Sequence, residues 1–320
     1  MTTYIIRRVL LIIPTLVISS LLVFLMIRLI PGSAVDIMMS RMDLTTAFTE
    51  EQRATVMREL GIDKAIWTQY GEWITGIITR GDLGTRIWER NSVTKEILRR
   101  LPITFELGVL ALITGLLISF PIGIYSGIRQ DNIGDYLGRS FAIFCIAVPG
   151  FWIATVVVVF PSIWWGWSPA IHLIKFAEDP VGNLVQFIIP AAIVGMGMAG
   201  ANMRMVRTMM LEVLRQDYIR TAWAKGLRER VVVLRHALRN AMIPVITIIG
   251  LQVPVLIGGT VIVEQIFALP GIGRLVISSA MERDYPSLSG SVFVIAGGVL
   301  IINLLIDLTY AWLDPRVQYS

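Results

Sequence analysis

A glycine cluster at residues 195–200, which read GMGMAG, has the spacing of a nucleotide-binding motif. Its spacing fits the fingerprint of a dinucleotide-binding loop, but that loop needs a strand before it and a helix N-terminus at the phosphate. The cluster lies instead within an apolar run, where the pairs Gly195 with Ala199 and Gly197 with Ala201 are typical of closely packed membrane helices. The sequence has no P-loop (GxxxxGK followed by Ser or Thr) either, so we expect any ATP that drives this protein to bind on another chain.

The chain has two histidines, His172 and His236. Neither has a second histidine, a cysteine or a close acidic residue at the spacing of metal ligands, so we predict no metal site. No serine lies in the setting of a nucleophile elbow, and no serine, histidine and acid converge within the apolar runs. We therefore predict no catalytic residue. A membrane scaffold or enzyme with a basic loop is an alternative class, but it would need such a constellation.

Three polar residues lie within apolar runs, where such groups are costly. Asn303 and Asp307 are one helical turn apart, and Glu106 lies near the start of another run. A proton relay would make the chain an ion-coupled secondary transporter, a class that concentrates such groups at the middle of the membrane. We expect Glu106 and Asp307 near opposite membrane surfaces, so we interpret these residues as packing groups.

The composition indicates which elements hold these residues. Hydrophobic residues make up 55% of the 320 residues and charged residues 16%, and the mean hydropathy is +0.71, unlike a soluble domain. One helical crossing of the hydrocarbon core needs about 20 mostly apolar residues. Six runs reach that length: Val9–Ile30, Ile103–Tyr125, Phe141–Trp164, Phe187–Met203, Ala241–Phe267 and Ser291–Leu313. Six prolines lie in or beside these runs and are expected to bend helices: Pro14, Pro121, Pro149, Pro190, Pro244 and Pro254. We predict an all-α integral membrane protein with six transmembrane helices.

The orientation follows from the segment between the fourth and fifth runs. It contains Arg204, Arg207, Arg215, Arg220, Lys225, Arg228, Arg230, Arg235 and Arg239 against Glu212, Asp217 and Glu229. Short basic loops stay in the cytoplasm, so this loop is predicted to be cytoplasmic, and six crossings then place both termini there. Arg7, Arg8 and Arg316 agree with that orientation. The net charge of +5 is read as this topology signal, and we expect no nucleic-acid partner.

The chain divides into three predicted parts. Residues 1–30 hold the N-terminus and the first transmembrane helix, residues 31–102 form an extracytoplasmic subdomain, and residues 103–320 form a core with five transmembrane helices and the basic loop 204–240. Within the subdomain, Thr49 to Leu60 has the pattern of a short amphipathic helix that ends at Gly61.

The most specific segment is cytoplasmic and reads YIRTAWAKGL from Tyr218 to Leu227, followed by RHALRN from Arg235 to Asn240. Small residues at Thr221, Ala222 and Ala224 allow a short helix to lie close against a groove, and Gly226 permits a sharp turn. A second helix then leads into the fifth crossing, so the segment could transmit force. The alternative is a solvated basic loop.

This segment resembles the signature loop of bacterial ABC-importer permeases, which reads Glu-Ala-Ala, three residues, then Gly. Arg220, Thr221, Ala222 and Gly226 occupy the corresponding positions, and only the second Ala and the Gly match strictly. In the B-type membrane subunit of the dipeptide and oligopeptide (and nickel) transport family, the loop typically reads RTARAKG and then RHALRNA. The chain matches nearly all of that version and departs from it at Trp223.

The resemblance extends along the whole chain, including the long segment after the first helix. The matching stretches are the amino-terminal Arg7-Arg8, residues 60–63 (LGID), 81–84 (GDLG), 100–102 (RLP), 270–274 (PGIGR), 284–286 (DYP) and 314–316 (DPR). The chain is therefore similar to a B-type subunit with a type I ABC-importer permease fold.

The resemblance implies the site and the partners. The ATPase-coupling loop would be Arg220, Thr221, Ala222, Trp223, Ala224, Lys225 and Gly226, with Arg235, His236, Arg239 and Asn240 as its second part. The implied partners are a second (C-type) permease, two ATPases that carry ATP and Mg²⁺, an extracytoplasmic solute-binding protein and the lipid bilayer of the bacterial inner membrane. The chain itself would be no enzyme and would hold no cofactor. Di- and oligopeptides are the implied substrates, with nickel complexes, glutathione and oligosaccharides as alternatives, and the sequence identifies no substrate-binding residue.

Overall fold

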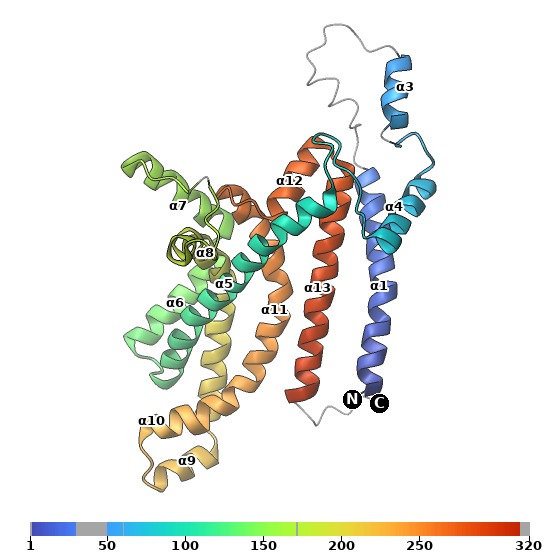
Figure 1. Ribbon diagram of the computed structural model, residues 1–320. Helices are drawn as coiled ribbons and strands as arrows, with labels where there is room; N and C mark the ends of the chain where they lie inside the picture. The colour runs from blue at the N-terminus through green and yellow to red at the C-terminus, as the bar shows by residue number, and fades with distance from the viewer. Residues whose placement is uncertain (1, 30–49, 60, 171, 314–320) are drawn as a thin grey trace. The chain divides into compact units, whose positions relative to one another are not determined.

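The computed structural model describes residues 2–29, 50–59, 61–170 and 172–313 (Figure 1). Within these ranges the regular elements are helical, apart from an isolated bridge between Thr85 and Ser92. In chain order they are α1 (Thr2–Arg28), α3 (Glu50–Glu59), α4 (Ile66–Arg80), α5 (Val93–Ile128), α6 (Ile133–Ala147), α7 (Gly150–Trp165), α8 (Pro180–Leu214), α9 (Asp217–Ala224), α10 (Glu229–Val231), the π-helix η1 (Val232–Ala237), α11 (Leu238–Ile266), α12 (Ile272–Glu282) and α13 (Tyr285–Leu313).

Five helices in the described ranges are long and apolar enough to cross a membrane: α1, α5, α8, α11 and α13. The third apolar run is not one continuous helix, because it is divided into α6 and α7, which are bent by 93°. Val148 has the extended angles φ −91° and ψ 122° that a following proline favours, and Pro149 then precedes the first turn of α7. Counted as one span, this pair gives the six crossings expected from the sequence.

The contacts divide the chain into two units. One unit is formed by the described residues of Met1–Ile103 and Pro270–Leu304. Its core contains buried Val93, Ile97 and Leu275, and Gly290 of α13 lies so close that an added Cβ would be 2.9 Å from a Val93 methyl group. This close approach requires glycine, because a side chain there would overpack the core.

The second unit comprises residues Thr104–Leu269 and the described part of Leu305–Pro315. In it α8 packs against α6, α7 and α11. An added Cβ on Gly195 of α8 would lie 2.9 Å from the Gly115 backbone nitrogen of α5, and one on Gly200 would lie 2.6 Å from the Ala142 carbonyl oxygen of α6. The predicted small-residue packing is confirmed at Gly195. It is not found at Gly197, which has no atom within 4 Å of an added Cβ.

The predicted short helix before Gly61 is present as α3. Gly61 has a positive φ of 66°, and the Ile62 N–H donates to the Met57 carbonyl at 3.1 Å, as in a glycine-terminated helix. Thr49 and the side chains of Val56 and Leu60 lie outside the described residues, so the amphipathic character of this helix stays a prediction.

Candidate functional site

The candidate site is the segment between α8 and α11, which the sequence predicts to be cytoplasmic. The chain leaves α8 at Leu214, forms the short helix α9, turns through Lys225 to Arg228, and returns through α10 and η1 directly into α11. Figure 1 shows α9 and α10 as two short helices beyond the end of α11. The expected second helix that continues into the fifth crossing is therefore confirmed.

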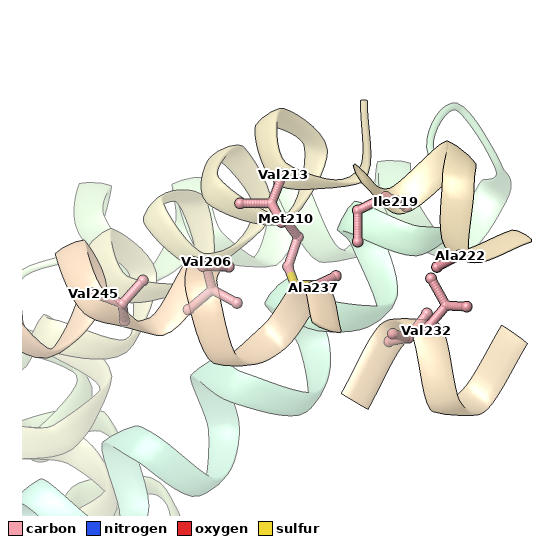
Figure 2. Close-up of a cluster of buried hydrophobic side chains, with 10 residues drawn as sticks. Val206, Met210, Val213, Ile219, Ala222, Val232, Ala237 and Val245 are labelled. Atoms are coloured by element: carbon pink, nitrogen blue, oxygen red, sulfur yellow. The ribbon is translucent and has the colours of Figure 1, made fainter. Parts of the chain in front are cut away.

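A cluster of buried apolar side chains holds this segment together (Figure 2). α9 contributes Ile219 and Ala222, which share one helix face because they are three positions apart. Opposite them lie Val232 and Ala237 of η1, and Met210 comes from α8. Ile219, Met210, Val232 and Ala237 are fully buried. Burying a large aliphatic side chain in this way stabilises a fold by about 1.5–3 kcal/mol, so α9 is a packed element and not a solvated loop.

Gly226 ends α9 with the geometry that only glycine adopts easily. Its φ is +78°, its N–H donates to the Trp223 carbonyl at 2.9 Å, and the Leu227 N–H donates to the Ala222 carbonyl at 3.4 Å. These two bonds form a Schellman motif, in which a left-handed residue reverses the chain after a helix. The predicted turn at Gly226 is confirmed, and an added Cβ would have no atom within 4 Å, so the requirement is conformational.

The outer face of this segment is exposed and mixes apolar with basic groups. Trp223 is 44% exposed and Leu234 49% exposed. The other exposed residues of the predicted loop are Arg220, Thr221, Ala224, Lys225, Gly226, Arg235, Arg239 and Asn240, whereas His236 is partly buried and Ala222 is buried. Exposed indole and leucine side chains beside arginine are typical of a binding surface.

Hydrogen bonds and an ion pair connect α9 with α11 and α8 with α6. The Asn240 side-chain amide donates to the Tyr218 hydroxyl at 2.8 Å and so joins α11 to α9. Arg207 of α8 donates from Nε and Nη2 to the two carboxylate oxygens of the buried Asp135 of α6, at 2.7 and 2.8 Å. Arg215 donates to the Gln130 side chain in the turn before α6 at 3.0 Å. Because this guanidinium–carboxylate pair is bidentate, it restrains the orientation as well as the distance of the two side chains, and so holds α6 in a fixed orientation against α8.

Two features of the site were missed by sequence reasoning. The π-helix η1 occupies Val232–Ala237, and single π turns inside helices frequently mark functional sites. The pair Asp135 and Arg207 joins positions 72 residues apart, which no local pattern links. Asp135 lies before the third apolar run, Phe141–Trp164, so the sequence offered no signal that singled it out.

The remaining polar candidates do not gather into a site. Within the described residues no group of three or more His, Cys, Asp or Glu side chains could hold a metal ion. The Glu106 Oε1 atom is buried and has no hydrogen-bond partner among the described residues. Asn303 is exposed and Asp307 is partly buried. A different buried acid, Glu264 of α11, accepts a hydrogen bond from the Thr104 hydroxyl at 2.7 Å.

A mostly apolar cavity of about 490 Å³ lies among α7, α8 and α11. Its lining includes Phe151, Gly197, Val255 and Gln252. The Gln252 Oε1 atom is buried and has no hydrogen-bond partner among the described residues. A buried amide oxygen without a donor is costly, so this group is available to a ligand that enters the cavity. No local sequence pattern predicts this cavity, because its lining comes from three separate helices.

Comparisons with known proteins agree along the chain. Residues 119–319 match the family model described as binding-protein-dependent transport system inner membrane component, and residues 1–108 match the model of its N-terminal part. The chain is 36% identical to the dipeptide transport system permease protein of Escherichia coli strain K12, with 100% of both chains covered. It is also 36% identical to a putative peptide transport system permease protein of Brucella abortus and to the glutathione transport system permease protein of Pectobacterium atrosepticum, again with 100% of both chains covered.

The fold is similar to a solved structure described as a crystal structure of an amino acid ABC transporter with histidines. That match has a TM-score of 0.52 and 12% sequence identity, and it covers 70% of this chain and 95% of the other. At such low identity the likeness concerns the fold alone.

Proposed function

The chain belongs to the family of binding-protein-dependent transport system inner membrane components, and from this premise we propose that it forms, with a second permease, the membrane path of an importer for di- and oligopeptides. The peptide substrate is supported by the 36% identity to dipeptide and peptide permeases over the full chain length. The chain is a multi-pass inner-membrane protein, since five of its helices, or six with the bent pair, are long and apolar enough to cross a bilayer.

The observation that carries the mechanism is the two-sided construction of the segment from Asp217 to Asn240. Its inner face is packed by Ile219 and Val232, while its outer face presents Trp223 and Arg220. We propose that this outer face, formed by the residues of Arg220 to Gly226 other than the buried Ala222, with Arg235, His236, Arg239 and Asn240, contacts a separate ATPase. The continuous helix through η1 and α11 would then carry movement of the ATPase into the membrane.

The proposed complex contains a C-type permease, two ATPases that bind ATP and Mg²⁺, and an extracytoplasmic solute-binding protein. The chain itself holds no cofactor and hydrolyses no ATP in this proposal, since its sequence lacks a P-loop. The purified chain should therefore show no ATP hydrolysis, whereas the assembled complex in proteoliposomes should hydrolyse ATP and accumulate a labelled dipeptide. Hydrolysis by the chain alone, or a complex that moves no dipeptide, would refute this function.

Both termini and the basic loop are proposed to lie in the cytoplasm, in keeping with the nine basic residues of segment 204–239. Cysteines introduced at the exposed positions Asp63 and Lys175 should then react with a membrane-impermeant maleimide in intact cells, and a cysteine at Arg228 should react after lysis. Labelling of Arg228→Cys alone in intact cells would reverse the orientation.

Glutathione is the second candidate substrate, because a glutathione permease is equally similar at 36% identity. Competition between a labelled dipeptide and unlabelled glutathione in the same proteoliposomes distinguishes the two substrates.

We propose that the cavity lined by Gln252 is part of the transport path, since a buried amide oxygen in an apolar cavity can accept hydrogen bonds from the N–H groups of a peptide. Gln252→Leu should lower dipeptide uptake by about tenfold while it leaves assembly intact.

A further inference from the structure

A second cavity, in the unit of Met1–Ile103 and Pro270–Leu304, is lined by three arginines, Arg28, Arg86 and Arg90. Its volume is about 240 Å³, and the rest of its lining is Ile62, Thr85, Ile87, Tyr285 and Pro286. Like charges gathered in one partly buried place are unfavourable unless acids compensate them. The charges around the cavity therefore decide what it can bind.

Arg28 is held in place by uncharged groups. Its Nε donates to the Gln69 side-chain oxygen at 3.1 Å, and its guanidinium lies 4.5 Å from the Phe24 ring centre and 4.9 Å from that of Tyr285. Its Nη1 atom is buried and has no hydrogen-bond acceptor in the described part of the chain. A fixed guanidinium with an unused buried donor is costly alone and favourable beside an anion.

The positive charge of Arg86 is partly neutralised by nearby acids. Its Nη2 lies 2.8 Å from a carboxylate oxygen of Glu89, while its buried Nε is 3.7 Å from Asp284 and makes no hydrogen bond within the described residues. The fully buried Asp284 is occupied elsewhere, because its oxygens accept from the Ile87 backbone N–H at 3.2 Å and from the Ser287 hydroxyl at 2.6 Å. Asp284 therefore fixes the backbone of the cavity wall more than it neutralises the arginine.

Arg90 completes the group from an exposed position. Its φ is +55°, in the left-handed region that a non-glycine residue adopts only at a cost, and no ion pair to it is found among the described residues. Within the described residues the three cations thus face two acids in ion-pair distance, Glu89, which is itself exposed, and Asp284. The cavity has an excess of positive charge and buried N–H donors without acceptors.

We propose that this cavity binds a carboxylate, held by Arg28, Arg86 and Arg90. A carboxylate accepts two parallel N–H bonds from a guanidinium, so it would satisfy the unused donors and balance the charge together. Two sources have this chemistry: the free carboxyl end of a peptide, and an acidic side chain of a protein that delivers it. Only the identification of the source rests on the proposed function, since the charge and the donors belong to this chain.

The test uses the full chain in lipid nanodiscs and two probes that differ in charge, N-acetylglycine and N-acetylglycinamide. Ligand-observed NMR titration should give a Kd for the carboxylate about tenfold or more below that for the amide, since hydrogen bonds between charged groups are the stronger ones. Arg90→Gln should weaken carboxylate binding several-fold and leave the melting temperature unchanged, because Arg90 is exposed. The matched control is Arg80→Gln, an exposed arginine outside this cavity, which should bind as the wild-type chain does. Equal binding of the two probes, or an Arg90→Gln chain that binds N-acetylglycine as tightly as wild type, would overturn the site.

The source is identified by competition against N-acetylglycine. Displacement by Ala-Ala but not by Ala-Ala amide supports the peptide carboxyl end, and displacement by the purified solute-binding protein supports an acidic side chain of that protein. Displacement by neither competitor would overturn both sources. Failure of peptide uptake with intact carboxylate binding would count against the proposed function and not against this site.

Discussion

The helix α8 is held in two different ways along its length. In its apolar part it contacts α5 and α6 through glycines, so that Gly195 and Gly200 bring backbones together. Toward its C-terminal end Met210 packs instead with the aliphatic side chains of Ile219 and Val232. The two kinds of packing differ because one part of α8 is expected to face lipid and the other water. Lipid tails provide no hydrophobic driving force between helices, so close fit must hold them, whereas water drives aliphatic side chains together.

Opposite substitutions should therefore destabilise the two regions of α8. The glycine contacts should fail when a side chain is added, and the aliphatic cluster should fail when a side chain is removed. The exposed side chains of Trp223 and Ala224 on α9 should tolerate both changes structurally, because substitutions at exposed positions away from packed contacts change stability little.

The largest effect is expected for Ile219→Ala, which removes a fully buried side chain from the aliphatic cluster. Such truncations cost about 2–5 kcal/mol, and α9 has few other buried contacts, so this helix should detach while the membrane helices stay folded. Hydrogen exchange of residues 217–227 should become fast, and ATP hydrolysis by the assembled complex should lose its dependence on substrate. Arg228→Ala, an exposed control, should change neither. Slow exchange in Ile219→Ala would show that the cluster does not hold α9.

The next effect is expected for Gly195→Val, which adds a side chain where α5 and α8 meet. The new Cβ would lie 2.9 Å from the Gly115 backbone nitrogen, and backbone cannot rotate away as a side chain can. Overpacking of this kind costs roughly 3 kcal/mol, so the chain should lose its resistance to protease and melt earlier in detergent. Gly197→Ala is the matched control, since it has no atom within 4 Å of the new Cβ. Equal losses in the two variants would mean that close packing does not hold this region.

A smaller effect is expected for Asp135→Asn, which tests the pair that fixes α6 against α8. The substitution leaves the Arg207 guanidinium without its carboxylate, and Arg207 is 18% exposed, so water offsets part of the loss. We expect a cost of about 2 kcal/mol, below the 3–5 kcal/mol of a fully buried pair, measured as a lower melting temperature. Asp217→Asn breaks the exposed pair with Arg220 and should leave the melting temperature unchanged. A drop of equal size in Asp217→Asn would contradict the contrast between the two pairs.

The smallest stability effect is expected for Gly226→Val, at the end of α9. The residue has φ +78°, so a side chain costs about 1–2 kcal/mol through backbone strain, and no neighbour within 4 Å adds a steric term. The turn should open locally, and transport should fall more than global stability does. Uptake of a labelled dipeptide at matched subunit levels is the measurement, with the exposed Arg228→Ala, outside the proposed contact surface, beside it as the control. Full uptake by Gly226→Val would show that the turn geometry has no role in coupling.

Local sequence patterns were enough for the elements that depend on local chemistry. Apolar length predicted the spans, and Gly61 and Gly226 ended their helices as expected, because a positive φ favours glycine wherever it occurs. Of the three small residues that suggested close contact, only Ala222 is buried within the chain, since the helical period places it beside Ile219 and leaves Thr221 and Ala224 outside.

Contacts between distant positions could not be predicted in the same way. The Asp135 and Arg207 pair joins two helices, and the arginine cavity joins Arg28, Arg86 and Arg90 with α13, so neither has a local signature. The break at Pro149 was anticipated as a bend, but its angle of 93° depends on packing. The π turn at Val232–Ala237 gives no signal in a propensity pattern.

Cross-linking tests most directly whether the outer face of α9 contacts a separate ATPase. The buried native Cys145 is replaced by alanine, and a single cysteine is introduced at Ala224, which is exposed on α9. In the assembled complex a short bismaleimide should then join Ala224→Cys to an introduced cysteine in the ATPase surface cleft, and the yield should change when ATP is added. Asp63→Cys, exposed on the other unit, should give no such product. An ATPase cross-link from Asp63→Cys with none from Ala224→Cys would contradict the account.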